Sequence, residues 1–141
     1  MKIEVLDTTL RDGAQAEGVT LSIDDKAECI RLFDDLKIDY IEAGTPFANP
    51  KDKKLLCDDD DVKTVNSHLV AFGSTRHKNN LTDEDSALNL LSLSKTQFVS
   101  VVGKSSVTQA EKVLQVSAQD NLKMIYDSIR FLCDRNKTVF F

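Results

Sequence analysis

The chain has 141 residues, of which 41% are hydrophobic and 29% charged, and its formal net charge is −5 at pH 7. These values are typical of one globular domain or part of one, and the acidic balance disfavours a nucleic-acid partner. No apolar run reaches the roughly 18 residues of a membrane span, and no signal peptide precedes the first strand pattern. The cysteines Cys29, Cys57 and Cys133 have no paired spacing, so we expect reduced thiols in a cytoplasmic protein.

Five short apolar runs, rich in β-branched residues, recur along the chain and predict buried strands. They are Ile3–Leu6, Ile38–Ile41, Leu69–Phe72, Phe98–Val102 and Thr138–Phe141. Three of the intervening stretches begin with capping-box spacing, in Ser22 with Asp25, Thr82 with Asp85 and Ser117 with Asp120. Helical spacing then predicts the buried faces Ala27, Ile30, Phe33 and Leu36; Ala87, Leu88 and Leu91; and Leu122, Ile125, Ile129 and Leu132.

The stretch between the second and third predicted strands is the least regular. Lys51–Asn66 has the weakest helical pattern of the four intervening stretches. Its acidic run Asp58–Asp61 is either a divalent-metal patch or solvated surface. The second interpretation is favoured, because consecutive positions on a helix do not converge on one point.

Strict alternation of strands and helices predicts an α/β fold with a parallel sheet and right-handed crossovers. Two architectures fit, an open doubly wound sheet or a (β/α)8 barrel. A full barrel needs about 250 residues, so four strand–helix units and a fifth strand make about half of one. The chain ends on the apolar residues 139–141, in mid-strand. We therefore expect residues 1–141 to be the truncated N-terminal half of a barrel, ending after strand five.

Polar residues gather directly after the predicted strands. They are Asp7–Gln15, then Glu42 with residues 44–46, then Gly73–Arg76, then Gly103–Ser106. The carboxyl ends of parallel strands share one face of an α/β fold, which is where ligands bind. This asymmetry predicts a functional site at that face.

The loop after the first strand combines four useful groups. Arg11 can polarise a carbonyl or clamp a carboxylate, and Asp12 is an oxygen ligand for a hard metal. Gly13 allows a tight turn, and Gln15 adds a neutral amide. The alternative is that Arg11 and Asp12 simply pair with each other or with neighbouring residues.

Three further charged residues are candidates for this site. Glu42 is either a catalytic base, an acceptor for a substrate hydroxyl, or a partner that neutralises Arg11. Arg76 and Lys104 are either contacts for a carboxylate or phosphate, or ordinary solvated charges. His77 is a possible metal ligand or proton shuttle, although a loop histidine is more often simply exposed.

The string Asp7–Gln15 resembles the pyruvate-carboxylase-like superfamily of aldol synthases and lyases. That superfamily includes citramalate, 2-isopropylmalate and homocitrate synthases and 3-hydroxy-3-methylglutaryl-CoA lyase. The resemblance continues through the segments Asp39–Gly44, Ala71–Arg76, Val102–Ser105 and Asn121–Ser128, which are most similar to the citramalate synthase branch.

The resemblance implies an acyltransferase that condenses acetyl-CoA with an α-keto acid, foremost pyruvate to give citramalate, in branched-chain amino-acid biosynthesis. It also implies a divalent metal (Mn, Mg or Zn) with Asp12 as a ligand. Arg11 then contacts the keto oxygen, Gln15 holds the substrate or orders the loop, and Glu42 and Arg76 line the site. The alternatives are a 2-isopropylmalate or homocitrate synthase, and a non-catalytic, self-associating α/β module.

The chain departs from the family pattern at its end. The histidine pair that completes the metal site in the family, and an acidic residue expected just past strand five, are absent from this sequence. We therefore expect the chain alone to be inactive. Because a half barrel leaves strand edges open, we also expect copies of the chain to associate as a homo-oligomer.

Overall fold

The computed structural model describes residues 2–58 and 62–141. Its strands are β1 (Leu6–Asp7), β2 (Tyr40–Gly44), β3 (His68–Ser74), β4 (Phe98–Val102) and β5 (Thr138–Phe140). They form one parallel sheet in the order β1-β2-β3-β4-β5. A doubly wound sheet reverses its strand order at a switch point, so the consecutive order favours the barrel arrangement.

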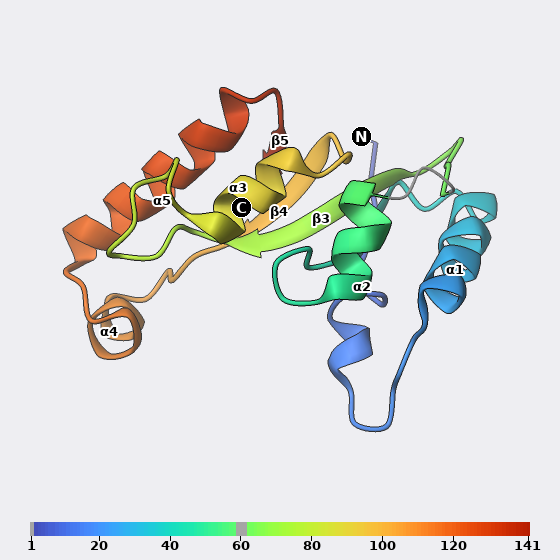
Figure 1. Cartoon of the computed structure of the whole chain (residues 1–141), viewed down its shortest axis with the longest axis horizontal. Coiled ribbons are helices and arrows are strands. Elements are labelled where there is room, and N and C mark those ends of the chain that lie inside the picture. Colours follow the sequence, from blue (N-terminus) through green and yellow to red (C-terminus); the bar gives the residue numbers. More distant parts are fainter. Residues whose placement is uncertain (1, 59–61) are drawn as a thin grey trace.

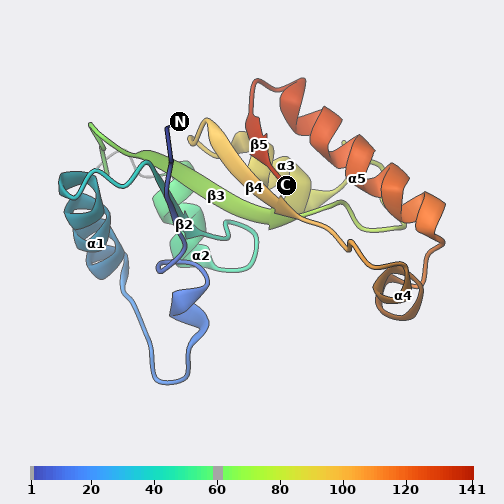
Figure 2. The ribbon, with the colours of Figure 1, turned by 180° about the vertical axis from the view of Figure 1, so that it is seen from behind.

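Helices connect the strands. They are α1 (Ile23–Asp35), α2 (Pro50–Lys53), α3 (Ser86–Leu93), α4 (Val107–Gln109) and α5 (Ala118–Cys133). A 3-10 turn spans Gly13–Gln15, and π-helical turns follow α2 at Lys54–Asp58 and α4 at Ala110–Leu114. The ribbon is an open arch in which α2 and α3 lie on one face of the sheet (Figure 1). The other face, toward the viewer in Figure 2, carries no helix among the described residues. None of the helices in the described ranges combines the length and apolar character of a membrane span.

The alternation of side chains along the strands separates two environments. One face of the sheet packs against the helices and forms the core, with Ile41, Ala71 and Val99 fully buried against side chains such as Ile30 and Leu132. We call the other, helix-free face the inner face. The core therefore lies between the sheet and its helices, which leaves the inner face for other contacts.

Aromatic side chains cover the inner face at the amino ends of β2, β3 and β4, and the last residue of β5 joins them. Tyr40 of β2, His68 of β3, Phe98 of β4 and Phe140 of β5 form one cluster, with ring centroids 4.7–5.9 Å apart. Edge-to-face and offset aromatic pairs of this kind stabilise a sheet across its strands. Because these rings fill the amino-terminal part of the inner face, a polar site has room only toward the carboxyl ends.

The strand predictions are confirmed in number, order and direction, but only Phe98–Val102 has the predicted bounds, and β1 and β2 differ most. The paired part of β1 is only Leu6–Asp7, whereas the prediction was Ile3–Leu6. The second strand runs past its predicted end at Ile41 to Gly44. Lys51–Asn66 holds only α2 and the π turn, and Asp59–Asp61 of the acidic run lie outside the described residues. The short helix α4 was not predicted.

The helix predictions need one correction each for α1, α3 and α5. The capping box of Ser22 and Asp25 is confirmed, but Leu36 is 71% exposed because α1 has already ended there. The residue that caps α3 is Asp85 itself rather than Thr82.

The buried face of α5 was assigned wrongly in part. Its predicted member Leu122 is 65% exposed, whereas Asn121, Met124 and Ser128 are buried. The buried polar side chains hydrogen-bond inside the protein, Asn121 to the carbonyl of Lys104 and Ser128 to that of Met124. A pattern that counts only apolar residues cannot detect such positions.

A buried carboxylate ties α1 to the start of β3. Asp34 accepts hydrogen bonds from the backbone N–H groups of Val65, Asn66 and Ser67. Burial acts to raise the pKa of Asp34, but these hydrogen bonds outweigh it and hold the pKa below its ordinary value of 3.8. The ionised form is therefore the one that the folded chain stabilises.

This predicts an acid-dependent contribution to stability. The contribution of Asp34 is present above its ordinary pKa and is lost as the pH falls through the lowered folded-state pKa. We expect Asp34→Asn to lower the free energy of unfolding by about 1–2 kcal/mol near neutral pH, with the difference shrinking in acid. Urea unfolding between neutral and acid pH measures it, with exposed Asp35→Asn as the control. A deficit that does not depend on pH would contradict the prediction.

Candidate functional site

The loop after β1 is a tight turn that is held by hydrogen bonds between its own residues. The carboxylate of Asp7 accepts the backbone N–H of Thr9 at 2.9 Å and its hydroxyl at 3.1 Å. The carbonyl of Thr8 accepts the N–H groups of residues 11, 12 and 13, and Leu10 is buried in the core. These bonds and this anchor fix the backbone on both sides of Arg11.

The side chain of Arg11 contacts three different segments of the chain. Its Nε donates to Oε2 of Glu42 at 2.5 Å, and its Nη1 donates to Oδ1 of Asp12 at 2.8 Å. The guanidinium carbon lies 4.1 Å from the ring centroid of Phe72, which is a cation–π contact. Within residues 2–58 and 62–141, Nη2 has no hydrogen-bond partner. The two N–H donors of Nη2 on this fixed cation are therefore left for a ligand.

Glu42 holds this arrangement from within the sheet. Its side chain is 2% exposed, and Ser100 of β4 donates a hydrogen bond to its Oε1 while Arg11 takes its Oε2. Both carboxylate oxygens thus have partners, as a buried charge requires. The expected pairing of Glu42 with Arg11 is present, while its direct part in catalysis remains a prediction.

Sequence reasoning missed Ser100 and Phe72. Both lie on the inner face, at alternate positions in strands that otherwise read as apolar. The single hydroxyl in Phe98–Val102 was the available signal, since a serine in a buried strand needs an internal partner. The cation–π contact of Phe72 had no such signal, because strand aromatics usually only pack.

Asp12 and Gln15 lie at the open side of the same loop. The Asp12 side chain is 63% exposed, and its Oδ2 has no partner within the described part of the chain. Gln15 and Arg11 line a cavity of about 350 Å³ between this loop and the start of α2. The described residues contain no group of three or more His, Cys, Asp or Glu placed to hold a metal. Asp12 thus fits a divalent metal as one oxygen ligand, not as a complete site.

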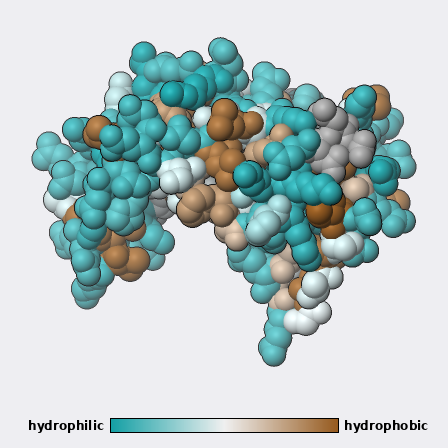
Figure 3. All heavy atoms as spheres, in the orientation of Figure 1, coloured by the Kyte–Doolittle hydropathy of each residue, from teal (hydrophilic) through white to brown (hydrophobic). Residues whose placement is uncertain are grey.

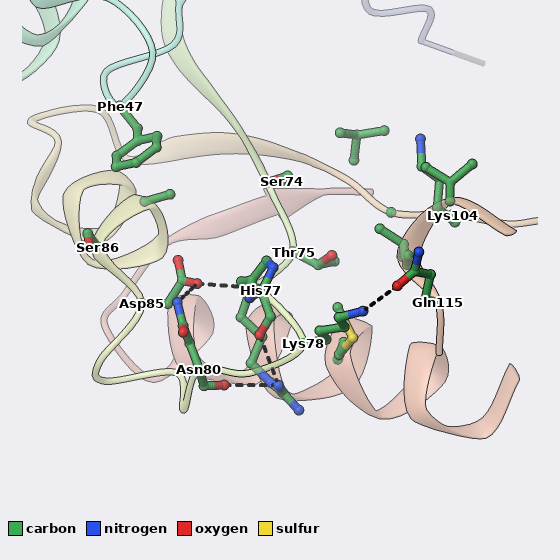
Figure 4. A pocket seen from close by; sticks show the side chains of 17 residues that line it. Phe47, Ser74, Thr75, His77, Lys78, Asn80, Asp85, Ser86, Lys104 and Gln115 are labelled. Carbon is green, nitrogen blue, oxygen red and sulfur yellow. Dashed lines mark hydrogen bonds between the residues drawn. The ribbon is translucent and has the colours of Figure 1, made fainter. Parts of the chain in front are cut away.

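Arg76 and Lys104 are not brought into contact with Arg11. They line a second cavity of about 610 Å³ at the carboxyl ends of β3 and β4, shown in Figure 4. Arg76 donates to the carboxylate of Asp127 at 3.0 Å and to the carbonyl of Asn80 at 3.0 Å. The predicted site residues therefore form two groups at the same end of the sheet, and only the Arg11 group is in direct contact.

The second cavity is held together by a carboxylate that the sequence reasoning treated only as a helix cap. Asp85 accepts hydrogen bonds from the N–H of His77 and the side-chain amide of Asn80 (Figure 4), besides capping α3 through Leu88. Burial acts to raise the pKa of Asp85, and these hydrogen bonds lower it more. The His77 ring accepts the N–H of Asn79 through Nδ1 at 3.3 Å, so its position follows from this loop.

The chain matches a family profile and several curated proteins. The HMGL-like family profile matches residues 2–141. A curated (R)-citramalate synthase of Sulfolobus acidocaldarius is 40% identical over 92% of this chain and 25% of that protein. A 2-isopropylmalate synthase of Shouchella clausii is 31% identical over 95% of this chain and 25% of that protein. The chain thus spans about a quarter of the length of these relatives.

The structural comparison concerns the fold. A solved HMG-CoA lyase of Bacillus subtilis superposes with a TM-score of 0.73 and 18% identity, over 98% of this chain and 45% of that chain. The five parallel strands form a curled half barrel. In the space-filling view, a hollow lies in the lower outline between the α4 segment and the loop that follows β1 (Figure 3). The predicted fold, the N-terminal half of a (β/α)8 barrel, is confirmed.

The Ser100 hydroxyl is open to a direct test. Ser100→Ala leaves one oxygen of buried Glu42 without its donor, so we expect the free energy of unfolding to fall by about 1.5–3 kcal/mol. Urea unfolding at neutral pH measures this, with exposed Ser105→Ala as the matched control, expected to change stability by less than about 0.5 kcal/mol. Equal values for the two variants would refute the importance of the Ser100–Glu42 bond.

Proposed function

This chain belongs to the HMGL-like family, and we propose that it is the N-terminal half of the catalytic barrel of an enzyme that condenses acetyl-CoA with an α-keto acid. One observation carries the proposal. Arg11 is fixed by Glu42, Asp12 and Phe72, and both N–H donors of its Nη2 are left open at the carboxyl end of the sheet. Relatives named citramalate synthase, at 40% identity, support the reaction class.

In the proposed reaction, Arg11 binds the keto oxygen. The methyl carbon of acetyl-CoA gives up a proton to a general base and attacks the keto carbon, so the π electrons of the keto group move onto its oxygen, which then takes up a proton. Water afterwards hydrolyses the thioester and releases the CoA thiol. A positive donor that is already oriented stabilises the negative charge that develops on the keto oxygen, without reorganising during the reaction. The bond of Glu42 to Nε holds the guanidinium plane, and Phe72 covers one of its faces. Glu42 thereby orients Arg11, whether or not it also moves a proton.

We propose that Asp12 supplies one ligand of a divalent metal, Mn, Mg or Zn, with the remaining ligands outside this chain. When bound, such a metal would supply Lewis-acid polarisation of the ketone and would orient it. Asp12 suits this part, because its Oδ2 is open while Oδ1 is held by Arg11.

Gln15 is proposed to contact the keto acid, since it lines the same cavity as Arg11. Arg76 and Lys104 line the larger cavity, and we propose that they meet a more distant part of the substrates. The pairing of Arg76 with Asp127 makes it an oriented donor rather than a free charge.

Pyruvate is the proposed keto acid, with citramalate as the product. The support is comparative, because the relatives named citramalate synthase are more similar to this chain than the 2-isopropylmalate synthase is. The alternatives are a larger keto acid, as in a 2-isopropylmalate or homocitrate synthase. An apolar pocket discriminates one methylene by about 1–3 kcal/mol, so the relative rates with keto acids of different length measure this choice.

A chimaeric enzyme tests the proposal. This chain replaces the matching quarter of the Sulfolobus acidocaldarius citramalate synthase, and thiol release from acetyl-CoA is followed with pyruvate and Mn²⁺. We expect release that is faster with pyruvate than with larger keto acids. Arg11→Lys should lower kcat about 10²–10³-fold, because Lys lacks the oriented fork of donors. Arg31→Lys, on the exposed face of α1, is the matched control and should leave kcat unchanged.

The isolated chain completes this experiment. Under the same conditions we expect no thiol release from it, because its residues supply one metal ligand at most. A folded chimaera that is inactive with every keto acid would contradict the proposed function and favour a non-catalytic, self-associating α/β module. The mass of the isolated chain in solution measures whether copies of it associate, as that alternative and the expected homo-oligomer both require.

A further inference from the structure

A buried ion pair, Lys26 with Asp52, lines the same cavity as Arg11 and Gln15. Lys26 of α1 donates to Oδ1 of Asp52 in α2 at 2.6 Å, and each residue is 5% exposed. Two charges buried in this way lose their hydration, and replacing such a pair with uncharged groups often leaves stability unchanged. Stability alone is therefore a weak reason for the pair, and its contacts suggest another.

The pair binds the backbone directly after Glu42. Lys26 also donates to the carbonyl of Ala43 at 2.9 Å, and Oδ2 of Asp52 accepts the N–H of Thr45 at 2.9 Å. The pairing register between β2 and β3 shifts at this point, where Glu42 lies opposite Val70 and Gly44 lies opposite Ala71. Ala43 is therefore the extra residue of a β-bulge, and Lys26 satisfies the carbonyl that the ladder leaves out.

Gly44 makes this contact possible. A Cβ atom at this position would lie 2.4 Å from the Asp52 carboxylate, which is far inside van der Waals contact. The carboxylate can thus approach the backbone only because residue 44 has no side chain. The ion pair, the glycine and the bulge form one unit that fixes residues 43–45.

A bulge beside a site redirects the side chains next to it. Here the neighbour is Glu42, whose carboxylate must meet both Arg11 and Ser100 on the inner face. We propose that Lys26 and Asp52 are positioning residues that hold the bulge and thereby set the Glu42–Arg11 contact. Their importance for catalysis rests on the proposed function of Arg11, whereas the effect on the geometry of Arg11 does not.

The Arg11 Nε–H group reports this geometry. The NMR signal of this group is assigned as the one that disappears in the variant Arg11→Lys. The position of the signal and the rate at which its proton exchanges with water are then measured in the unmodified chain and in the double variant Lys26→Met/Asp52→Asn. This double variant keeps the shapes of both side chains and removes both charges. We expect the signal to move and its exchange to become about tenfold faster, the effect of losing one charge-assisted hydrogen bond. Glu42→Gln should produce the same change directly.

Global stability and a distant ion pair provide the controls. Core amides such as those of Val70 and Val99 should keep their protection in the double variant, while Arg130→Ala, which removes the exposed pair with Asp134, should leave the Arg11 signal unchanged. An unchanged Arg11 signal in a folded double variant overturns the proposal. Failure of both the double variant and Asp52→Asn to fold also overturns it, because the pair then serves the fold as a whole. The readout needs no turnover, so it stands apart from the test of the reaction.

Discussion

The hydrogen-bonded contact between Arg11 and Glu42 is the interaction on which this site depends. A carboxylate that is 2% exposed is costly unless every oxygen has a partner, and Arg11 and Ser100 supply those partners from two other segments. The contact joins the β1 loop, β2 and β4 at one point of the inner face. Because Glu42 takes Nε and Asp12 takes Nη1, the direction of Nη2 and its two N–H donors is set by the fold rather than by a ligand.

Side-chain alternation in the parallel strands makes this possible. In β2, Ile41 and Ala43 pack into the core with the helices, while Tyr40 and Glu42 belong to the inner face. The same division in β3 and β4 places Phe72 and Ser100 beside Glu42. The core under the helices and the site therefore lie on opposite faces of the same strands, and the bulge at Ala43 lies directly beside Glu42.

Much of the fold followed from the sequence, since strand runs and helix caps are local signals. The caps at Ser22 and Ser117 and the strand Phe98–Val102 were predicted as they occur. The errors came from non-local contacts. Asn121 and Ser128 are buried in place of Leu122, where Asn121 donates to the carbonyl of Lys104 and Ser128 accepts the N–H of Arg76. Likewise, Arg76 is held by Asp127, 51 positions along the chain, which no local pattern specifies.

The parallel α/β architecture and the candidate group Arg11, Asp12 and Glu42 can be predicted from consecutive residues, because strand periodicity and a polar loop after a strand are local patterns. The folded chain adds that Arg11 bonds to Glu42, that Ser100 bonds to the second carboxylate oxygen, and that Arg76 and Lys104 line a separate cavity. The physical reason is that these contacts join residues on different strands and helices. Their distances are fixed by sheet register, a bulge and buried hydrogen bonds rather than by spacing along the chain.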